Sequence, residues 1–357
     1  KSSIEQMFAL AFQHQKNGNP KDAEILYKNI LKSQPNHWKS LGNLGILAEQ
    51  SNRYDKAKIF LQEALQIEPN NEKLHYNLGI VFEELVDIKQ ALNCYKKAWQ
   101  INNDYENAIK KISFLLGGYK LDINLIQEKQ IEELFLTLFK RNDIIHDDIF
   151  LNARLFLFIE ENNNQVRKIV NSDSLLLKNQ TIQNLLKEEL FLLMLQKSLM
   201  ADQFIEKMLA KLRYEILFTL VDSGKNVLEE YLDFIISLAE QCFLNEYVYV
   251  QSKKEINHVK KLINEMSSKK EINELKIAIL GCYIPLLSNE NIANILSDYK
   301  SKNILFNDLI NMQIKEPLKE KKLVNSIKSL GKISDAVSNK VRGQYEEYPY
   351  PRWRYTY

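Results

Sequence analysis

The sequence has few of the residues that interrupt helices. Only 10 glycines and 7 prolines occur among its 357 residues. Both residue types break helices, and a fold of many short strands needs them at its turns. Their scarcity favours long helices and argues against an all-β protein. A chain of this length also exceeds one ordinary hydrophobic core, which predicts two domains.

Cysteines are few, the charge is balanced, and long apolar runs are missing. The three cysteines, Cys94, Cys242 and Cys282, form no C-x-x-C pair and no cluster with zinc spacing. The 48 basic and 46 acidic residues give no electrostatic case for nucleic acid. No apolar run reaches the roughly 18 residues that span a membrane, and no signal peptide is visible. We therefore expect reduced thiols, no metal, no nucleic-acid or membrane partner, and a cytoplasmic location.

Small and apolar residues recur every 34 positions in the first third of the chain. The recurring sets are Leu10, Leu44 and Leu78; Ala11, Gly45 and Gly79; Ala23, Ala57 and Ala91; Tyr27, Leu61 and Tyr95; Ile30, Ala64 and Ala98; and Pro35, Pro69 and Asn103. This period and these positions resemble the tetratricopeptide repeat, a pair of antiparallel helices. Small residues let the two helices approach closely, and the proline ends the second helix because it cannot continue the hydrogen-bond ladder.

The register predicts a solenoid of three repeats followed by a capping helix. The repeats are expected at 4–37, 38–71 and 72–105, and the capping helix over 106–116, stopped by Gly117-Gly118. A single helix pair cannot bury its apolar face, so neighbouring repeats must stack.

Beyond residue 118 the 34-residue period ends, but helical periodicity continues. Leu228, Tyr231, Ile235 and Leu238 follow helical spacing, and no alternating β pattern persists. The predicted fold class is all-α. We expect a repeat domain at 1–117, a helical bundle at 118–340 and an extended strap at 341–357.

The first helix of each repeat is expected to line the concave face of the solenoid, where a protein or an extended peptide would bind. Two asparagines occupy the same place on this face in repeats 2 and 3. Asn43 and Asn77 both stand in the string N-L-G, and Lys39 and Lys73 share a place one turn earlier. An asparagine side chain offers a carbonyl and an amide, so it can bond both groups of a peptide main chain. The alternative is that N-L-G is merely common in these repeats and that the asparagine caps local backbone. Both interpretations stay open.

The asparagine placement resembles the asparagine ladder of O-linked N-acetylglucosamine transferases, which implies binding of extended peptide. The carboxylate clamp of chaperone-binding repeats fits badly, because repeat 1 has Phe8 and Phe12 where a clamp needs Lys and Asn. Sugar transfer would also need a nucleotide-sugar domain, which this sequence lacks.

Two stretches of the second half superficially suggest catalysis. Glu240, Cys242 and Glu246 could form a cluster, but the next histidine, His258, is 16 residues on, so a packed helix is favoured. Residues 277–283 read I-A-I-L-G-C-Y, without the G-x-G spacing of a nucleotide site. A helix ending before Pro285 fits better. We therefore assign no catalytic, cofactor or metal residue to this chain.

The sequence ends with aromatic residues and prolines interleaved with charge. Residues 341–353 read V-R-G-Q-Y-E-E-Y-P-Y-P-R-W, and the prolines favour extended backbone. We expect a strap that packs between domains. Its interdomain residues are Gln344, Tyr345, Tyr350, Arg352 and Trp353.

Three segments resemble a family of bacterial proteins in which tetratricopeptide repeats and a helical region precede an S-adenosylmethionine-dependent methyltransferase domain. They are Q-C-F-L-N-E-Y-V-Y at 241–249, C-Y-I-P-L at 282–286 and Q-Y-E-E-Y-P-Y-P-R-W at 344–353. That family usually has Asn where this chain has Tyr348. The resemblance implies a substrate-binding and regulatory region for a domain that binds S-adenosylmethionine and is not part of this chain. The alternative is a free-standing repeat scaffold that joins other proteins.

Overall fold

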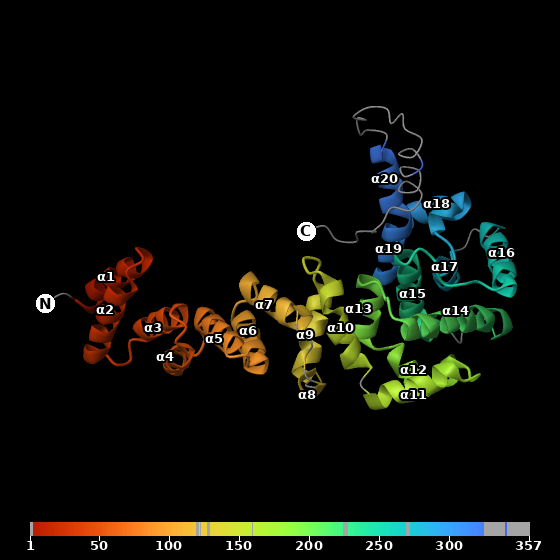
Figure 1. The fold of residues 1–357 in the computed structure, drawn as a ribbon. Helices are drawn as coiled ribbons and strands as arrows, with labels where there is room; N and C mark the ends of the chain where they lie inside the picture. The colour runs from red at the N-terminus through yellow and green to blue at the C-terminus, as the bar shows by residue number, and fades with distance from the viewer. Residues whose placement is uncertain are drawn as a thin grey trace. The chain divides into compact units, whose positions relative to one another are not determined.

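The computed structural model describes residues 3–118, 121, 123–126, 129–158, 160–223, 228–268, 272–324 and 340. Helices make up all regular structure in these ranges, and no strand occurs among them (Figure 1). The all-α prediction is therefore confirmed. Contacts divide the chain into two compact units, Lys1–Leu134 and Phe135–Tyr357.

The first unit begins with seven helices that follow the predicted 34-residue register. Their bounds are α1 Ile4–Lys16, α2 Pro20–Ser33, α3 Trp38–Gln50, α4 Tyr54–Ile67, α5 Glu72–Glu84, α6 Ile88–Ile101 and α7 Glu106–Gly118. Consecutive helices form three pairs, α1 with α2, α3 with α4, and α5 with α6 (Figure 1). Each pair packs against the next helix in the chain. This part of the structure is the predicted solenoid.

Local sequence explains where these helices begin and end. Ser3 and Gln6 form a capping box at the start of α1, and Pro20 stands in the first turn of α2, where its missing N–H costs nothing. The second helices of repeats 1 and 2 end at Ser33 and Ile67, two residues before Pro35 and Pro69. Proline therefore marks the helix ends as predicted.

The recurring small and large residues form the core of this unit. Ala23, Ala57 and Ala91 are completely buried, as are their neighbours in the register Tyr27, Leu61 and Tyr95. Each alanine leaves room for the preceding helix, and each large residue fills the space between the paired helices.

The capping helix α7 differs in one detail from the prediction. It was expected to stop at Gly117-Gly118, but its helical conformation includes both glycines. Glycine weakens a helix interior without forbidding it, and the last turn tolerates it best. The buried side chains of Ile109 and Ile112 lie on α7, which packs against α6.

The second unit is built from shorter and less regular helices. Helix α8 (Ile123–Ile126) precedes the boundary between the units, and helix α9 (Lys129–Lys140) crosses it. The helices that follow are α10 His146–Leu157, α11 Glu160–Asn171, α12 Gln180–Leu185, α13 Glu189–Lys197, α14 Gln203–Ser223, α15 Leu232–Leu244, α16 Lys253–Ser268, α17 Glu274–Gly281, α18 Glu290–Ser297, α19 Ile304–Ile310 and α20 Glu316–Val324. Short 3-10 turns occur at Leu176–Lys178 (η1), Glu229–Tyr231 (η3) and Leu286–Ser288 (η4), and a π-helical turn at Asn311–Lys315 (η5).

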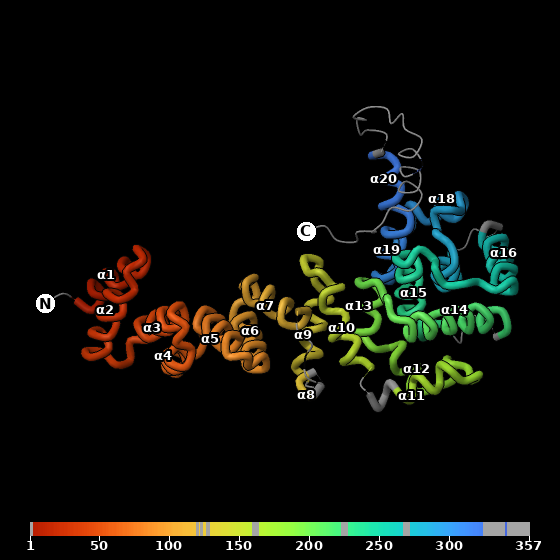
Figure 2. The backbone as a smooth tube through the Cα atoms, in the orientation of Figure 1, coloured from red at the N-terminus to blue at the C-terminus, as the bar shows by residue number. Residues whose placement is uncertain are grey.

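Helix α15 lies at the centre of the second unit. Its residues from Phe234 to Phe243 are all buried, and it contacts α13, α17 and α19 (Figure 2). A helix that is apolar around most of its circumference must be surrounded by others. The hydrophobic residues of α15 therefore hold this unit together.

A buried ion pair joins two helices of the same unit. Arg213 of α14 is only 1% exposed, and its Nη2 lies 3.6 Å from Oε1 of Glu255 on α16. Its guanidinium stacks over the ring of Tyr283, and Nη2 also donates to the Val250 carbonyl at 3.0 Å. A buried arginine needs such partners, because an unpaired charge in the interior is costly.

The predicted domain boundary at residue 117 stays a prediction. Within the first unit, Nζ of Lys96 on α6 lies 2.7 Å from Oε2 of Glu133 on α9. This ion pair links the repeats to residues beyond the predicted boundary. The predicted strap at 341–357 lies outside the described residues. No helix in the described ranges is long and apolar enough to cross a membrane.

Candidate peptide-binding site

Close contact between paired helices decides which side of α3 and α5 faces outward. A Cβ on Gly45 would lie 2.6 Å from Cγ of Leu61, and one on Gly79 would lie 2.6 Å from Cε1 of Tyr95. The glycine side of each helix therefore touches its partner helix. Asn43 and Asn77 precede these glycines by two residues, about 200° around the helix. They therefore point away from α4 and α6.

The structure gives the two asparagines different surroundings. The side-chain amide of Asn43 donates to the carbonyl oxygen of Lys39 at 2.9 Å, which is the local backbone bond of the alternative interpretation. No described residue donates a hydrogen bond to the Asn43 side-chain carbonyl oxygen. The Asn77 side chain forms no hydrogen bond with a described residue. Both asparagines are half-buried, whereas Lys39 and Lys73 are exposed.

A column of large apolar residues runs beside the asparagines. Phe12, Ile46, Ile80 and Phe114 recur every 34 residues, one on each first helix. Ile46 and Ile80 follow the asparagines by three residues and so share their face. Phe12 is 40% exposed and Phe114 is 55% exposed. Sequence reasoning treated Phe12 only as an obstacle to a carboxylate clamp, although the 34-residue spacing could have revealed the column.

Cations lie over the two aromatic ends of this column. Nζ of Lys16 is 4.8 Å from the centroid of the Phe12 ring, and Nζ of Lys111 is 5.9 Å from that of Phe114. Phe8 stacks on Phe12 with centroids 6.4 Å apart. The exposed rings are thus partly covered by charged side chains, which is a common way to keep an apolar surface in water.

Acidic residues stand at the opposite end of the first helices from Lys39 and Lys73. Glu83 accepts hydrogen bonds from the Tyr95 hydroxyl at 2.8 Å and from Lys111 Nζ at 3.0 Å. Burial raises the pKa of the Glu49 carboxyl, and the negative charge of Glu84 raises it further. Glu49 and Glu83 follow Gly45 and Gly79 by four residues, so they share the side of the helix that touches its partner. The outward face therefore has Lys39 and Lys73 near the helix N-termini, followed by the asparagines and the apolar residues.

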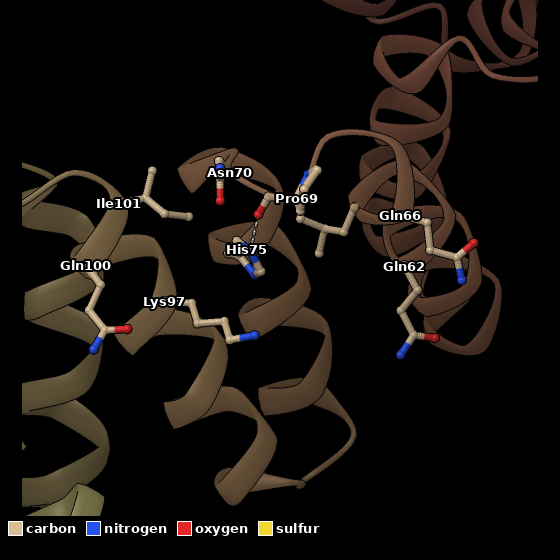
Figure 3. A pocket seen from close by; sticks show the side chains of 9 residues that line it. Gln62, Gln66, Pro69, Asn70, His75, Lys97, Gln100 and Ile101 are labelled. Carbon is tan, nitrogen blue, oxygen red and sulfur yellow. Dashed lines mark hydrogen bonds between the residues drawn. The ribbon is translucent and has the colours of Figure 1, made fainter.

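A pocket of about 740 Å³ lies on another face of the same unit. Its walls are Gln62, Leu65 and Gln66 from α4 and Lys97, Gln100 and Ile101 from α6, while Pro69, Asn70 and His75 lie between them (Figure 3). His75 precedes Asn77 by two residues on α5, so the two side chains point to different sides of that helix. The pocket is therefore separate from the asparagine column, and sequence reasoning missed it.

His75 forms the floor of this pocket. Its Nε2 lies 2.9 Å from the carbonyl oxygen of Pro69, to which it donates (Figure 3). Burial lowers the pKa of His75 and the Lys97 charge lowers it further, against the opposing effect of the Pro69 carbonyl. The lowered pKa favours the neutral imidazole, whose Nε2 carries the proton donated to Pro69.

The second unit holds the residues that superficially suggested catalysis. Glu240 and Cys242 are buried in α15, and His258 packs its ring against Phe218 at 4.9 Å. Burial raises the pKa of the Cys282 thiol well above its usual range, and the adjacent Cys242 thiol adds to this. Raised thiol pKa values disfavour the thiolate that a nucleophile needs.

The segment that superficially resembled a nucleotide site is helical. Residues Glu274–Gly281 form α17, which ends before Pro285. No group of three or more potential metal ligands comes together in the described part of the chain. The strap residues Gln344, Tyr345, Tyr350, Arg352 and Trp353 lie outside the described ranges.

Stacked helix pairs with a 34-residue register define a tetratricopeptide-repeat array. A sequence profile described as "Tetratricopeptide repeat" matches residues 14–79, within the first unit. No curated protein matches the chain. Repeats of this kind mediate contacts between proteins.

Several solved structures are similar to the chain. A mutant O-GlcNAc transferase from Thermobaculum terrenum shares 23% identity over 38% of this chain and 25% of its own, with a TM-score of 0.33. Pseudomonas aeruginosa pilF shares 19% identity over 64% of this chain and 81% of its own, with a TM-score of 0.32. A tetratricopeptide repeat protein from Parabacteroides merdae shares 12% identity over 87% of this chain and 98% of its own, with a TM-score of 0.31. The chain thus spans about a quarter of the length of the transferase that it matches.

Proposed function

We propose that the repeat unit holds an extended segment of another protein along the outward face of α1, α3, α5 and α7. The observation that carries this proposal is the apolar column from Phe12 to Phe114 beside Asn43 and Asn77. Exposed large apolar residues in a continuous row mark interaction surfaces, because water solvates them poorly. The asparagines would bond the main chain of the segment, with Lys39 and Lys73 at one edge.

The outward face suits a segment with both apolar and polar groups. Asn77 offers an amide and a carbonyl that no described residue uses, and Asn43 offers its carbonyl oxygen. Alternate side chains of an extended peptide point the same way, so apolar side chains could rest on the column while the main chain meets the asparagines.

We further propose a narrower role, in which the bound segment is presented to an S-adenosylmethionine-dependent methyltransferase domain elsewhere in the intact bacterial protein. Support for this role is the resemblance of the segments at 241–249, 282–286 and 344–353. In that role the strap would pack between the domains through Gln344, Tyr345, Tyr350, Arg352 and Trp353. The alternative remains a free-standing scaffold, which uses the same outward face.

Peptide binding tests the main proposal. Peptides selected from a random display library on the whole chain would be measured by calorimetry with the wild type and with Asn43→Ala/Asn77→Ala. We expect affinity to fall by about 1–3 kcal/mol, because hydrogen bonds to the main chain are lost. Asn93→Ala is the matched control, since Asn93 is a half-buried asparagine on α6. Unchanged affinity of the double variant for every selected peptide would refute the asparagine role.

The coding sequence beyond Tyr357 tests the narrower role. A methyltransferase of this kind needs a strand followed by a glycine-rich turn. If the downstream sequence lacks this pattern, the narrower role fails and the free-standing scaffold takes its place. Where such a domain follows, we expect S-adenosylmethionine to bind the longer polypeptide and not residues 1–357 alone. Binding to residues 1–357 alone would show a cofactor site that the present assignment lacks.

A further inference from the structure

The pocket between α4 and α6 has an unusual balance of charge. None of its lining residues is acidic, and Lys97 is the only side chain among them that is charged at neutral pH. Lys97 forms no ion pair with a described residue. Figure 3 shows its side chain reaching into the space between Gln62 and Gln100. The pocket therefore presents one uncompensated positive charge.

Amide side chains surround this charge on both walls. Gln62 and Gln66 are one turn apart on α4 and so share a face. Gln66 and Gln100 are 34 residues apart and occupy the same place in successive repeats. None of the three side chains bonds to a described residue. Two successive repeats therefore present the same unused amide on either side of the pocket.

The amides favour a peptide over a small oxyanion. A phosphate or carboxylate ion only accepts hydrogen bonds, so it would use the N–H groups of the glutamines and leave their carbonyl oxygens unmatched. A peptide main chain offers both N–H and C=O groups. Leu65 and Ile101 add an apolar wall for a neighbouring side chain. The volume of about 740 Å³ is within the usual range of binding pockets.

The floor of the pocket is held in place. His75 is only 9% exposed, and its hydrogen bond to the Pro69 carbonyl joins α5 to the turn that follows α4. A floor that is already ordered loses little entropy when a ligand binds.

We propose that this pocket binds an extended acidic peptide segment. The carboxylate of an Asp or Glu side chain pairs with Lys97, the glutamines Gln66 and Gln100 bond the flanking main chain, and an adjacent apolar side chain lies against Leu65 and Ile101. This site is independent of the asparagine column, so the chain can hold two segments at once. Its specificity comes from charge, whereas the outward face selects apolar side chains.

Selection followed by charge reversal tests the proposal. A display library of random linear peptides would be selected on the whole wild-type chain and in parallel on Lys97→Glu. We expect wild type to enrich peptides rich in Asp and Glu that Lys97→Glu does not retain. In fluorescence anisotropy, Lys97→Glu should weaken the binding of such a peptide about tenfold or more, and Gln66→Ala/Gln100→Ala should also weaken it.

Matched variants separate this pocket from other effects. Lys56→Glu is the charge control, because Lys56 is an exposed lysine of α4 outside the pocket. Lys56→Glu should leave binding of the acidic peptide unchanged. Asn43→Ala/Asn77→Ala should also leave it unchanged, because these asparagines belong to the outward face and test the proposed function instead. Circular dichroism would verify that each variant is folded.

Three results would overturn the acidic-peptide site. They are no enrichment of acidic residues by the wild type, equal retention of acidic peptides by Lys97→Glu, and competition by inorganic phosphate as strong as that by the unlabelled peptide. The last result would indicate a small-anion site instead. Each result leaves the outward face unaffected, so the two proposals can fail separately.

Discussion

Glycine in the first helix of repeats 2 and 3 decides how closely the paired helices approach. At Gly79 the nearest atom to an added Cβ would be Cε1 of Tyr95 at 2.6 Å, and Tyr95 is completely buried. A buried ring held on all sides cannot move aside without disturbing its neighbours. At the observed spacing of α5 and α6, a methyl group at position 79 would therefore have to displace the Tyr95 ring.

We predict that Gly79→Ala destabilises the repeat unit by about 1–3 kcal/mol, the usual cost of overpacking. Urea unfolding followed by circular dichroism would measure it. Gly118→Ala is the control, because an added Cβ there would lie 3.7 Å from Phe114, an ordinary contact. Alanine favours a helix over glycine, so this control should be neutral or slightly stabilising. Equal destabilisation by both variants would contradict the steric argument.

Glu24, in the first unit, has a carboxyl pKa well below its usual value. Both of its oxygens accept hydrogen bonds from Arg53, at 3.3 and 3.0 Å, and Lys28 lies 2.7 Å away. Arg53 and Lys28 lower the pKa of Glu24 from 4.5 to about 2. The pair joins α2 of the first repeat to the turn before α4 of the second.

We predict that this ion pair contributes stability above pH 4.5 that is lost as pH falls towards 2. The folded state lowers the carboxyl pKa, so the unfolded chain takes up a proton first and acid favours unfolding. The free energy of unfolding of Glu24→Gln should therefore approach that of the wild type as pH falls through this window. Arg53→Ala should raise the Glu24 pKa in an NMR titration. An unchanged titration would show that Arg53 is not the cause.

At the scale of elements, a single buried glutamine holds the connection between α13 and α14 in the second unit. Gln241 of α15 donates to the carbonyl oxygens of Leu195 and Ser198 at 2.8 and 2.7 Å and accepts from the Met200 N–H at 3.0 Å. These backbone groups belong to the end of α13 and the turn before α14. One buried side chain therefore satisfies three backbone groups in the last turn of α13 and in the connection that follows it.

We predict that Gln241→Leu destabilises the second unit by about 3 kcal/mol or more, because each buried orphaned backbone group costs about 1–3 kcal/mol. Gln251→Leu is the matched control, since Gln251 is half-buried and its Nε2 makes one bond, to the Tyr283 carbonyl at 3.2 Å. It should cost about 1 kcal/mol. Denaturant unfolding would compare them, and a control as damaging as Gln241→Leu would argue against the network.

At the scale of the whole molecule, each of the two compact units has its own buried core. The repeat unit gains stability from contacts between adjacent helix pairs, and the second unit from helices packed around α15. Substitutions that share no partners usually have independent effects. The two units should therefore respond separately to the substitutions above.

We predict that Gly79→Ala increases amide hydrogen exchange in peptides from residues 1–134 and leaves those from 135–357 unchanged. Gln241→Leu should show the reverse pattern. Hydrogen-exchange mass spectrometry of the whole chain would measure both. Increased exchange throughout the chain after either substitution would show that the units unfold as one.

Sequence alone predicted most of the repeat unit, because its determinants repeat at a fixed interval. The register located Ala23, Ala57 and Ala91 in the core and placed the helix ends before Pro35 and Pro69. It did not predict that α7 includes Gly117 and Gly118, since glycine in a last helical turn is tolerated rather than forbidden.

The candidate site was only partly accessible from sequence. The 34-residue spacing placed Asn43 and Asn77 on equivalent positions, but the bond from the Asn43 amide to Lys39 depends on rotamers that spacing does not fix. The pocket near His75 was missed because its walls come from helices 34 residues apart and its floor from α5, which lies between them in the chain. Its amides recur in register, but only the packing shows that they enclose a space.

The sequence by itself determined the all-helical class, the repeat period and the pairing of the first helices, because these follow from patterns within one or two turns or at one fixed interval. Only the tertiary structure decided the exposure of the apolar column, the pocket and the contacts of Gln241 and Arg213. These contacts join residues that are more than thirty positions apart in the chain. Their partners follow no period in the second unit, so packing alone determines which of the many possible pairs form.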